Sequence, residues 1–141
     1  MSSIRERIVL AVLARVGDAI APVPVLRQPT VPLTREESPA LLLLIEGDAI
    51  TRKANLAADR TLQLRLVAIA RGAAAFAQTD QIIVAAHAAL LNEPSLGGLA
   101  IGIDETDLEW DAEDADAGAV ALPVRFEIRY RTATHDLTHN G

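Results

Sequence analysis

The stretch VRFEIRYRT, residues 124–132, decides the fold because its apolar and charged side chains alternate without a break. Successive side chains of a β-strand point to opposite faces of the sheet, so the alternation predicts a strand with one buried and one polar face. The face predicted to be buried carries Val124, Phe126, Ile128 and Tyr130. The polar face carries Arg125, Glu127, Arg129 and Arg131.

Further strands are predicted upstream of this stretch. TLQLRLVAIAR, residues 61–71, alternates in the same way and places Arg65 and Arg71 on its mixed face. ALLLLIEGD, beginning at residue 40, predicts a buried strand that ends at Gly47. The proline-rich segment before it has room only for a short strand at residues 23–27. The residues of the alternating strand that we expect to face the core are Leu62, Leu64, Leu66 and Ala68.

Two amphipathic helices are predicted, at residues 4–20 and at about 73–91. In the first, apolar residues recur every four positions from Ile4, and Ser3 with Glu6 has the spacing of a capping box. In the second, an apolar set lies among alanines that permit close packing on a sheet. This set, spaced by seven, is Phe76, Ile83 and Leu90.

The stretch LLNEPSLGGLAIGI, residues 90–103, places two adjacent glycines between a helical and an alternating pattern. A phosphate loop would stand between a strand and the N-terminus of a helix. Here the order is helix, Gly-Gly, strand, so we interpret the glycines as a structural corner. Beyond it, Leu99, Ile101 and Ile103 share one face, whereas Leu108 and Trp110 have the opposite parity, which predicts a bulge near residues 104–106.

These patterns predict an α+β fold in which two main helices pack on one face of a mixed or mainly antiparallel sheet of about four to five strands. The length fits one domain, residues 1–141, whose polar end from 133 to 141 is expected to be a disordered tail. Residues 50–60 and 111–118 combine polar side chains with no apolar period. We therefore expect a mobile hairpin loop and a solvated acidic loop there.

The composition argues against a nonspecific nucleic-acid binder and against a membrane protein. The net charge is −6, whereas affinity for phosphate backbones comes chiefly from Lys and Arg. The longest apolar run, ALLLLI, is too short to span a bilayer, and charges interrupt the N-terminal apolar stretch that a signal peptide would need. We expect a soluble cytoplasmic protein. The absence of cysteine excludes disulfides and thiolate metal sites.

No residue pattern marks a catalytic, cofactor or metal site. His87 has no second His within a helical turn, and His135 and His139 lie in the predicted tail. The acidic stretch at 104–116 lacks the Gly and Glu spacing of a calcium-binding EF-hand. Nothing pairs a nucleophile with a His and an orienting carboxylate, so we expect no enzyme activity. The charged face of residues 124–132 is either a solvated sheet face or a polar subunit contact.

The order of elements, together with HAALLNEPSLGGLAIGI and ALPVRFEIRYRT, resembles the tail terminator proteins of long-tailed bacteriophages, also called minor tail protein U or tail completion proteins. The resemblance covers most of the chain. It implies a homo-hexameric ring that caps the tail tube, ends addition of the tail tube protein and offers a docking surface to a head-completion or connector protein. It also implies a structural role without chemistry or cofactor, in the host cytoplasm during assembly and then in the virion tail.

A ring of this kind needs two complementary surfaces on each protomer. We predict that basic residues of one copy, Arg52, Lys53, Arg125, Arg129 and Arg131, face acidic residues of its neighbour, Asp111, Glu113 and Asp114. An acidic ring suits DNA that passes through without specific binding. The alternatives are another head-tail connector or tail-tube-like protein and, beyond these, a small ligand-binding module or enzyme.

Overall fold

The computed structural model describes residues 1–28, 38–108 and 119–140. In chain order the elements are α1 (Ile4–Ile20), β1 (Val25–Arg27), β2 (Ala40–Ala54), β3 (Ala57–Arg71), α2 (Ala75–Leu91), β4 (Gly102–Leu108) and β5 (Ala119–Ala133). The strands form one sheet in the order β1-β2-β3-β5-β4, in which β1 pairs parallel to β2 and the other pairs are antiparallel. The predicted α+β fold with a mixed sheet is confirmed.

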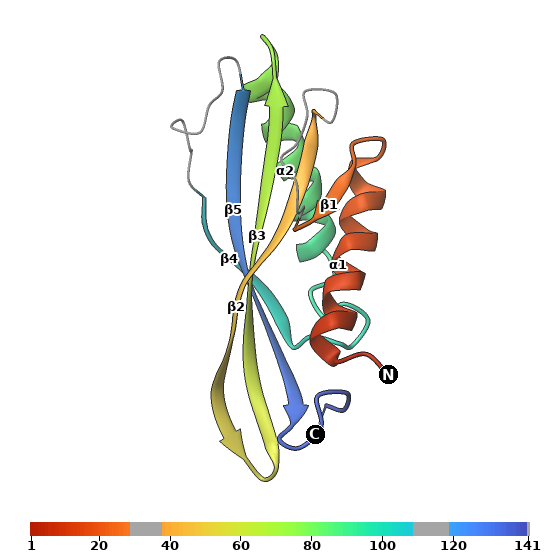
Figure 1. The fold of residues 1–141 in the computed structure, drawn as a ribbon, viewed down its shortest axis with the longest axis vertical. Coiled ribbons are helices and arrows are strands. Elements are labelled where there is room, and N and C mark those ends of the chain that lie inside the picture. Colours follow the sequence, from red (N-terminus) through yellow and green to blue (C-terminus); the bar gives the residue numbers. More distant parts are fainter. Residues whose placement is uncertain (29–37, 109–118, 141) are drawn as a thin grey trace.

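The strand quoted first lies inside the sheet and faces the core as its alternation predicts. Tyr130, Phe126 and Ile128 are almost fully buried on the face that the helices cover. They meet the apolar face of β3, where Leu62, Leu64, Leu66 and Ala68 are equally buried. Both helices lie on this side of the sheet. Among the described residues no helix lies over the opposite side, here called the open face (Figure 1).

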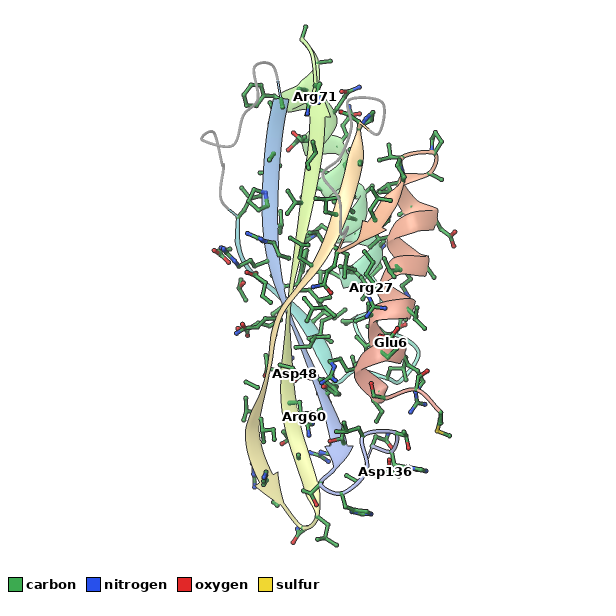
Figure 2. The ribbon with its side chains drawn as sticks, in the orientation of Figure 1. Glu6, Arg27, Asp48, Arg60, Arg71 and Asp136 are labelled. Carbon is green, nitrogen blue, oxygen red and sulfur yellow. The ribbon has the colours of Figure 1, made fainter. Side chains whose placement is uncertain are left out.

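The helix α1 begins at its predicted position. The Ser3 side chain accepts a hydrogen bond from the Glu6 backbone N–H at 3.0 Å. The Glu6 carboxylate does not complete the predicted capping box. It pairs instead with both terminal nitrogens of Arg27 at 2.7 Å each, which ties the helix to β1 (Figure 2).

The core face of α2 differs from the prediction at one position. Its buried stripe starts at Ala75 and continues through Thr79 to Ile82, Ile83, Ala86 and Leu90. Phe76, predicted to lie in this stripe, is 65% exposed. The small side chains of Ala75 and Thr79 occupy the core-facing positions of the first turns, and Phe76 follows about 100° further round the helix.

The prediction of a loop at residues 50–60 is wrong, and so is the end of the preceding strand at Gly47. A β-bulge interrupts the pairing with β3 between Ile45 and Gly47, and β2 then continues to Ala54. Asn55 and Leu56 form the turn, with φ of 52° and 67°. Positive φ at both central residues suits a tight hairpin. Residues 49–56 are exposed on both faces of the sheet and have no apolar period, so the sequence pattern hid the hairpin.

The hairpin extends the sheet past the helices (Figure 1). We call residues 49–60 of β2 and β3, together with residues 129–133 of β5, the arm. The residues expected to form a frayed tail turn back beside it: Ala133 forms a bridge with Asp136, and the backbone N–H of Ile4 donates to the Leu137 carbonyl at 2.9 Å. Asp136 stabilises this turn by accepting from both the backbone and the hydroxyl of Thr138 (Figure 2).

The Gly-Gly corner is structural, as predicted. Gly97 and Gly98 have φ of 69° and 94°, which a residue with a Cβ rarely adopts. The predicted bulge in the following strand is present, between Glu105 and Asp107. Ile103 is buried, but Ile101 and Leu108 are 55% and 45% exposed. Both stand at the ends of an edge strand, where solvent remains on one side. Trp110 and the loop predicted at residues 111–118 lie outside the described residues.

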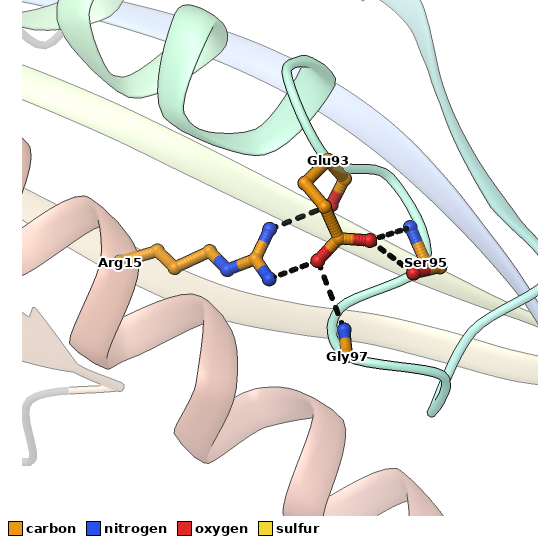
Figure 3. A network of polar contacts seen from close by, with 4 residues as sticks. All are labelled: Arg15, Glu93, Ser95 and Gly97. Carbon is orange, nitrogen blue, oxygen red and sulfur yellow. Dashed lines mark hydrogen bonds and ion pairs between the residues drawn. The ribbon is translucent and has the colours of Figure 1, made fainter.

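A carboxylate holds this corner against α1. Glu93 accepts hydrogen bonds from the backbone N–H of Ser95 at 3.1 Å and of Gly97 at 2.9 Å, and it pairs with the Arg15 guanidinium (Figure 3). Arg15 also donates to the Glu93 carbonyl at 2.6 Å. The hydrogen bond from Arg15, followed by those from the Ser95 hydroxyl and the Gly97 backbone N–H, lowers the pKa of Glu93 to about 2.

This network predicts an acid-dependent stability. A depressed pKa contributes stability that is present above the unfolded-state value and is lost as the pH falls toward about 2. Glu93→Gln should therefore lower the melting temperature at pH 7 and flatten its decline between about pH 5 and pH 2. Thermal melts of both proteins across this pH range test the prediction. Parallel pH profiles would show that Glu93 does not contribute to the acid dependence.

Candidate subunit interface

The open face carries the predicted interface arginines in cross-strand rows. Arg125 lies opposite Arg65 of β3 on one side and Asp107 of β4 on the other. At the arm, Arg131 lies opposite Asp59, which in turn lies opposite Arg52. Directly opposite residues project from the same face of a sheet, so each row forms one line of neighbouring side chains.

Arg125 is held between two carboxylates of its own chain. Its Nη1 lies 2.7 Å from Asp107 Oδ2, and its Nε lies 3.1 Å from Glu46 Oε1. These contacts, above all the hydrogen bond to Asp107, raise the pKa of Arg125. Arg65 beside it has a buried Nε without a hydrogen-bond partner among the described residues. The row therefore sets a guanidinium paired with two carboxylates beside a second guanidinium whose Nε has no such partner.

Arg129 and Arg131 are half exposed, and each also has a partner within the chain. Arg129 Nε lies 3.4 Å from Asp104 Oδ2, and Arg131 Nε donates to Asp59 Oδ1 at 2.7 Å. The hydrogen bond to Asp59 raises the pKa of Arg131. Both side chains remain about 50% accessible to solvent. Their charges are therefore ordered by the sheet and still available to a second molecule.

The remaining predicted basic residues lie at the tip of the arm. Arg52 and Lys53 are exposed, and the register places them on opposite faces of the hairpin. A hollow of about 320 Å³ opens beside the tip. Its lining includes Arg52 and Arg131 on either side of Asp59. The predicted acidic partners Asp111, Glu113 and Asp114 lie outside the described residues.

Sequence reasoning missed the carboxylates that order this face, namely Glu46, Asp59, Asp104 and Asp107. The position of Asp59 could have been predicted from the sequence. If the strand at residues 61–71 is extended backward, Ala58 and Arg60 share a face with Leu62, and Asp59 lies on the opposite face with Arg65. The acidic residues of β4 were assigned to a solvated stretch. Their pairing with Arg125 and Arg129 depends on the order of β5 and β4 in the sheet, which the sequence does not specify.

A buried polar cluster fixes the base of the arm to α1. Asp48 of β2 accepts hydrogen bonds from the Tyr130 hydroxyl and, at 3.0 Å, from Arg5 of the helix. The Asp48 side chain is 11% exposed. Burial, and then the hydrogen bond to Asp48, raise the pKa of the Tyr130 hydroxyl. Nearby, Arg60 donates from Nε to the Thr132 hydroxyl at 2.9 Å.

The candidate metal ligands do not converge. The ring of His87 lies 6.2 Å from that of Phe126, and its Nε2 is 3.8 Å from Glu105. His139 contacts Asp136 within the C-terminal turn. Residues 1–28, 38–108 and 119–140 contain no group of three His, Asp or Glu side chains placed to hold a metal ion. No helix within these ranges is long and apolar enough to cross a membrane.

Comparison with known proteins identifies the fold. Neither the protein-family models nor the curated proteins contain a match to this chain. Among solved structures, a chain of the virion of the native gene transfer agent particle is similar in fold, with a TM-score of 0.55. The similarity covers 90% of this chain and 90% of that chain at 12% sequence identity. This protein therefore shares its fold with a chain of a gene transfer agent virion.

The buried cluster gives a prediction about the arm. Tyr130→Phe leaves Asp48 buried with one donor fewer, which should lower the free energy of unfolding by about 1–2 kcal/mol. Urea denaturation measures the loss. In the control variant Gln63→Ala, on the open face, the free energy of unfolding should change by no more than about 0.5 kcal/mol.

Tyr130 is the only tyrosine, so absorbance at alkaline pH follows this hydroxyl alone. Its raised pKa means that stability declines as the pH rises above 10. Tyrosinate formation near pH 10 in the folded protein would contradict this assignment.

Proposed function

We propose that this protein is a structural component of a phage-like particle and acts as a tail terminator. In this role it forms a ring on the end of the tail tube, stops further addition of tube subunits and offers the surface to which the head attaches. Two independent similarities support the proposal. One is the resemblance of its sequence motifs to tail terminator proteins, and the other is its shared fold with a chain of a gene transfer agent virion.

The observation that carries the proposal is the open face. Its charged side chains lie in registered rows on the sheet, and no helix in the part of the chain that the structure describes covers them. A ring built from head-to-tail contacts requires two different, complementary surfaces on each protomer. Ordered charge pairs suit such a contact because they set orientation while leaving single protomers soluble.

The proposed partners are further copies of this chain in a homo-hexamer, the tail tube protein and a head-completion or connector protein. DNA would pass through the ring without specific binding, as the net charge of −6 favours. The proposed role involves no chemistry and no cofactor. The protein would assemble in the host cytoplasm and remain in the virion tail.

The second candidate is another head-tail connector or a tail-tube-like protein. The same fold similarity favours it, since the neighbouring structure belongs to a whole virion. A tube protein should polymerise into long cylinders, whereas a terminator should stop at a single ring.

Reversing the two exposed arginines, in Arg129→Glu/Arg131→Glu, tests the proposal. We expect a folded protein, because both side chains project from the open face and are about half exposed. Tails complemented with this variant should be overlong or fail to join heads, and head-joined tails should fall roughly tenfold or more. Electron microscopy of the particles counts them, and circular dichroism verifies the fold.

A charge swap provides the matched control. Adding Asp59→Arg and Asp104→Arg to the double reversal restores both ion pairs within the chain while inverting the charges that a neighbour meets. If the swap assembles normally and the reversal does not, only the internal pairs matter and the two arginines are not a subunit contact. Normal tail length and head joining in both variants would exclude this face from assembly altogether.

A further inference from the structure

We propose that the arm is the element with which one copy of this chain grips the β4 edge of the next copy. The inference rests on the proposed ring assembly and adds to it the two surfaces that meet. One surface is the basic arm, and the other is the acidic edge formed by β4.

The arm is preorganised for contact. Residues 49–56 are all exposed, and a tight turn with positive φ at Asn55 and Leu56 closes the hairpin. The Leu56 carbonyl accepts a hydrogen bond from the Thr134 backbone N–H at 2.8 Å, so the tip is fastened to the end of β5. An ordered element loses little conformational entropy when it docks.

The arm is basic within an acidic chain. Its one negatively charged side chain is Asp59, whereas five side chains are positively charged: Arg52, Lys53, Arg60, Arg129 and Arg131. The hollow of about 320 Å³ at the tip lies between two of these guanidinium groups. It can receive a carboxylate side chain, which guanidinium donors bind well.

The complementary surface lies at the other margin of the sheet. Among its seven residues β4 has three carboxylates and no basic residue: Asp104, Glu105 and Asp107. Their side chains are 62%, 39% and 44% exposed. Because β3 and β5 lie between β2 and β4, the tip of the hairpin and the β4 edge are separate surfaces of one copy. In the proposed contact they therefore bind different neighbours. This is the arrangement of a head-to-tail ring contact.

The contact uses side chains and does not extend the sheet. Bulges interrupt β2 between Ile50 and Arg52 and β4 between Glu105 and Asp107. Bulges and charges on an edge strand prevent pairing with another strand. A second copy is favoured over DNA as the occupant because the chain as a whole is acidic and would repel phosphate at long range.

Cysteine cross-linking tests the contact, since the chain contains no cysteine of its own. Arg52→Cys and Glu105→Cys are purified separately, mixed and oxidised mildly, both as concentrated protein and after incorporation into particles. The mixture should give a disulfide dimer at least about tenfold more abundant than either variant alone, because the contact raises the effective thiol concentration. The doubly substituted chain should give closed oligomers. Gln78→Cys, exposed on α2, is the control partner and should give only background with Arg52→Cys.

Three results would overturn the proposal: no dimer in either preparation, dimers of Arg52→Cys only with itself, or equal yields with the control. The variant Arg52→Glu/Lys53→Glu separates the hypothesis of ring capping from the hypothesis that the arm contacts β4. If the cross-link fails but this variant still yields uncapped tails, ring capping stands and the arm has another partner. If the unsubstituted protein binds duplex DNA, the Arg52→Glu/Lys53→Glu variant does not, and the yield of the Gln78→Cys control cross-link is unchanged, that partner is DNA.

Discussion

The structure depends on a mismatch in length between its sheet and its helices. Strands β2, β3 and β5 have 15 residues each, about 50 Å of extended chain, whereas each helix has 17 residues and spans about 25 Å. Because the two helices pack against each other and not end to end, they cannot cover the sheet along its whole length. One half is therefore a two-layer core, and the other half is stabilised by polar contacts and by the C-terminal turn.

Helix α1 shows how the two halves are joined. Three of its charged residues reach three different elements: Arg5 contacts Asp48 of β2, Glu6 contacts Arg27 of β1, and Arg15 contacts Glu93 at the corner after α2. Exposed ion pairs contribute little individually, but these act beside a continuous apolar stripe that is fully buried. The apolar stripe supplies most of the stability, and the pairs fix the orientation of the helix. The sheet that results is rigid enough to present registered charges on its open face.

Much of this fold was predictable, because its central strands and helices carry strong periodicity. The alternation of residues 124–132 and 61–71 and the four-residue repeat from Ile4 all predicted the observed burial. The hairpin of the arm was not predictable in this way, since residues 49–56 are exposed throughout and have no apolar period. For the candidate interface, the sequence indicated Arg52, Lys53 and the arginines of β5 but not their partners Asp59, Asp104 and Asp107. Those pairs are set by strand order and register, which arise only when distant segments pack together.

In the proposed role this chain closes into one ring at the end of a tail tube. Cryo-electron microscopy of the head-proximal end of tails from a particle that contains the protein tests this claim most directly. We expect a single ring of this chain, with the helices on one side of each sheet and each arm against β4 of the adjacent copy. Density for the chain repeated along the tube, or its absence from the tail end, would contradict the claim.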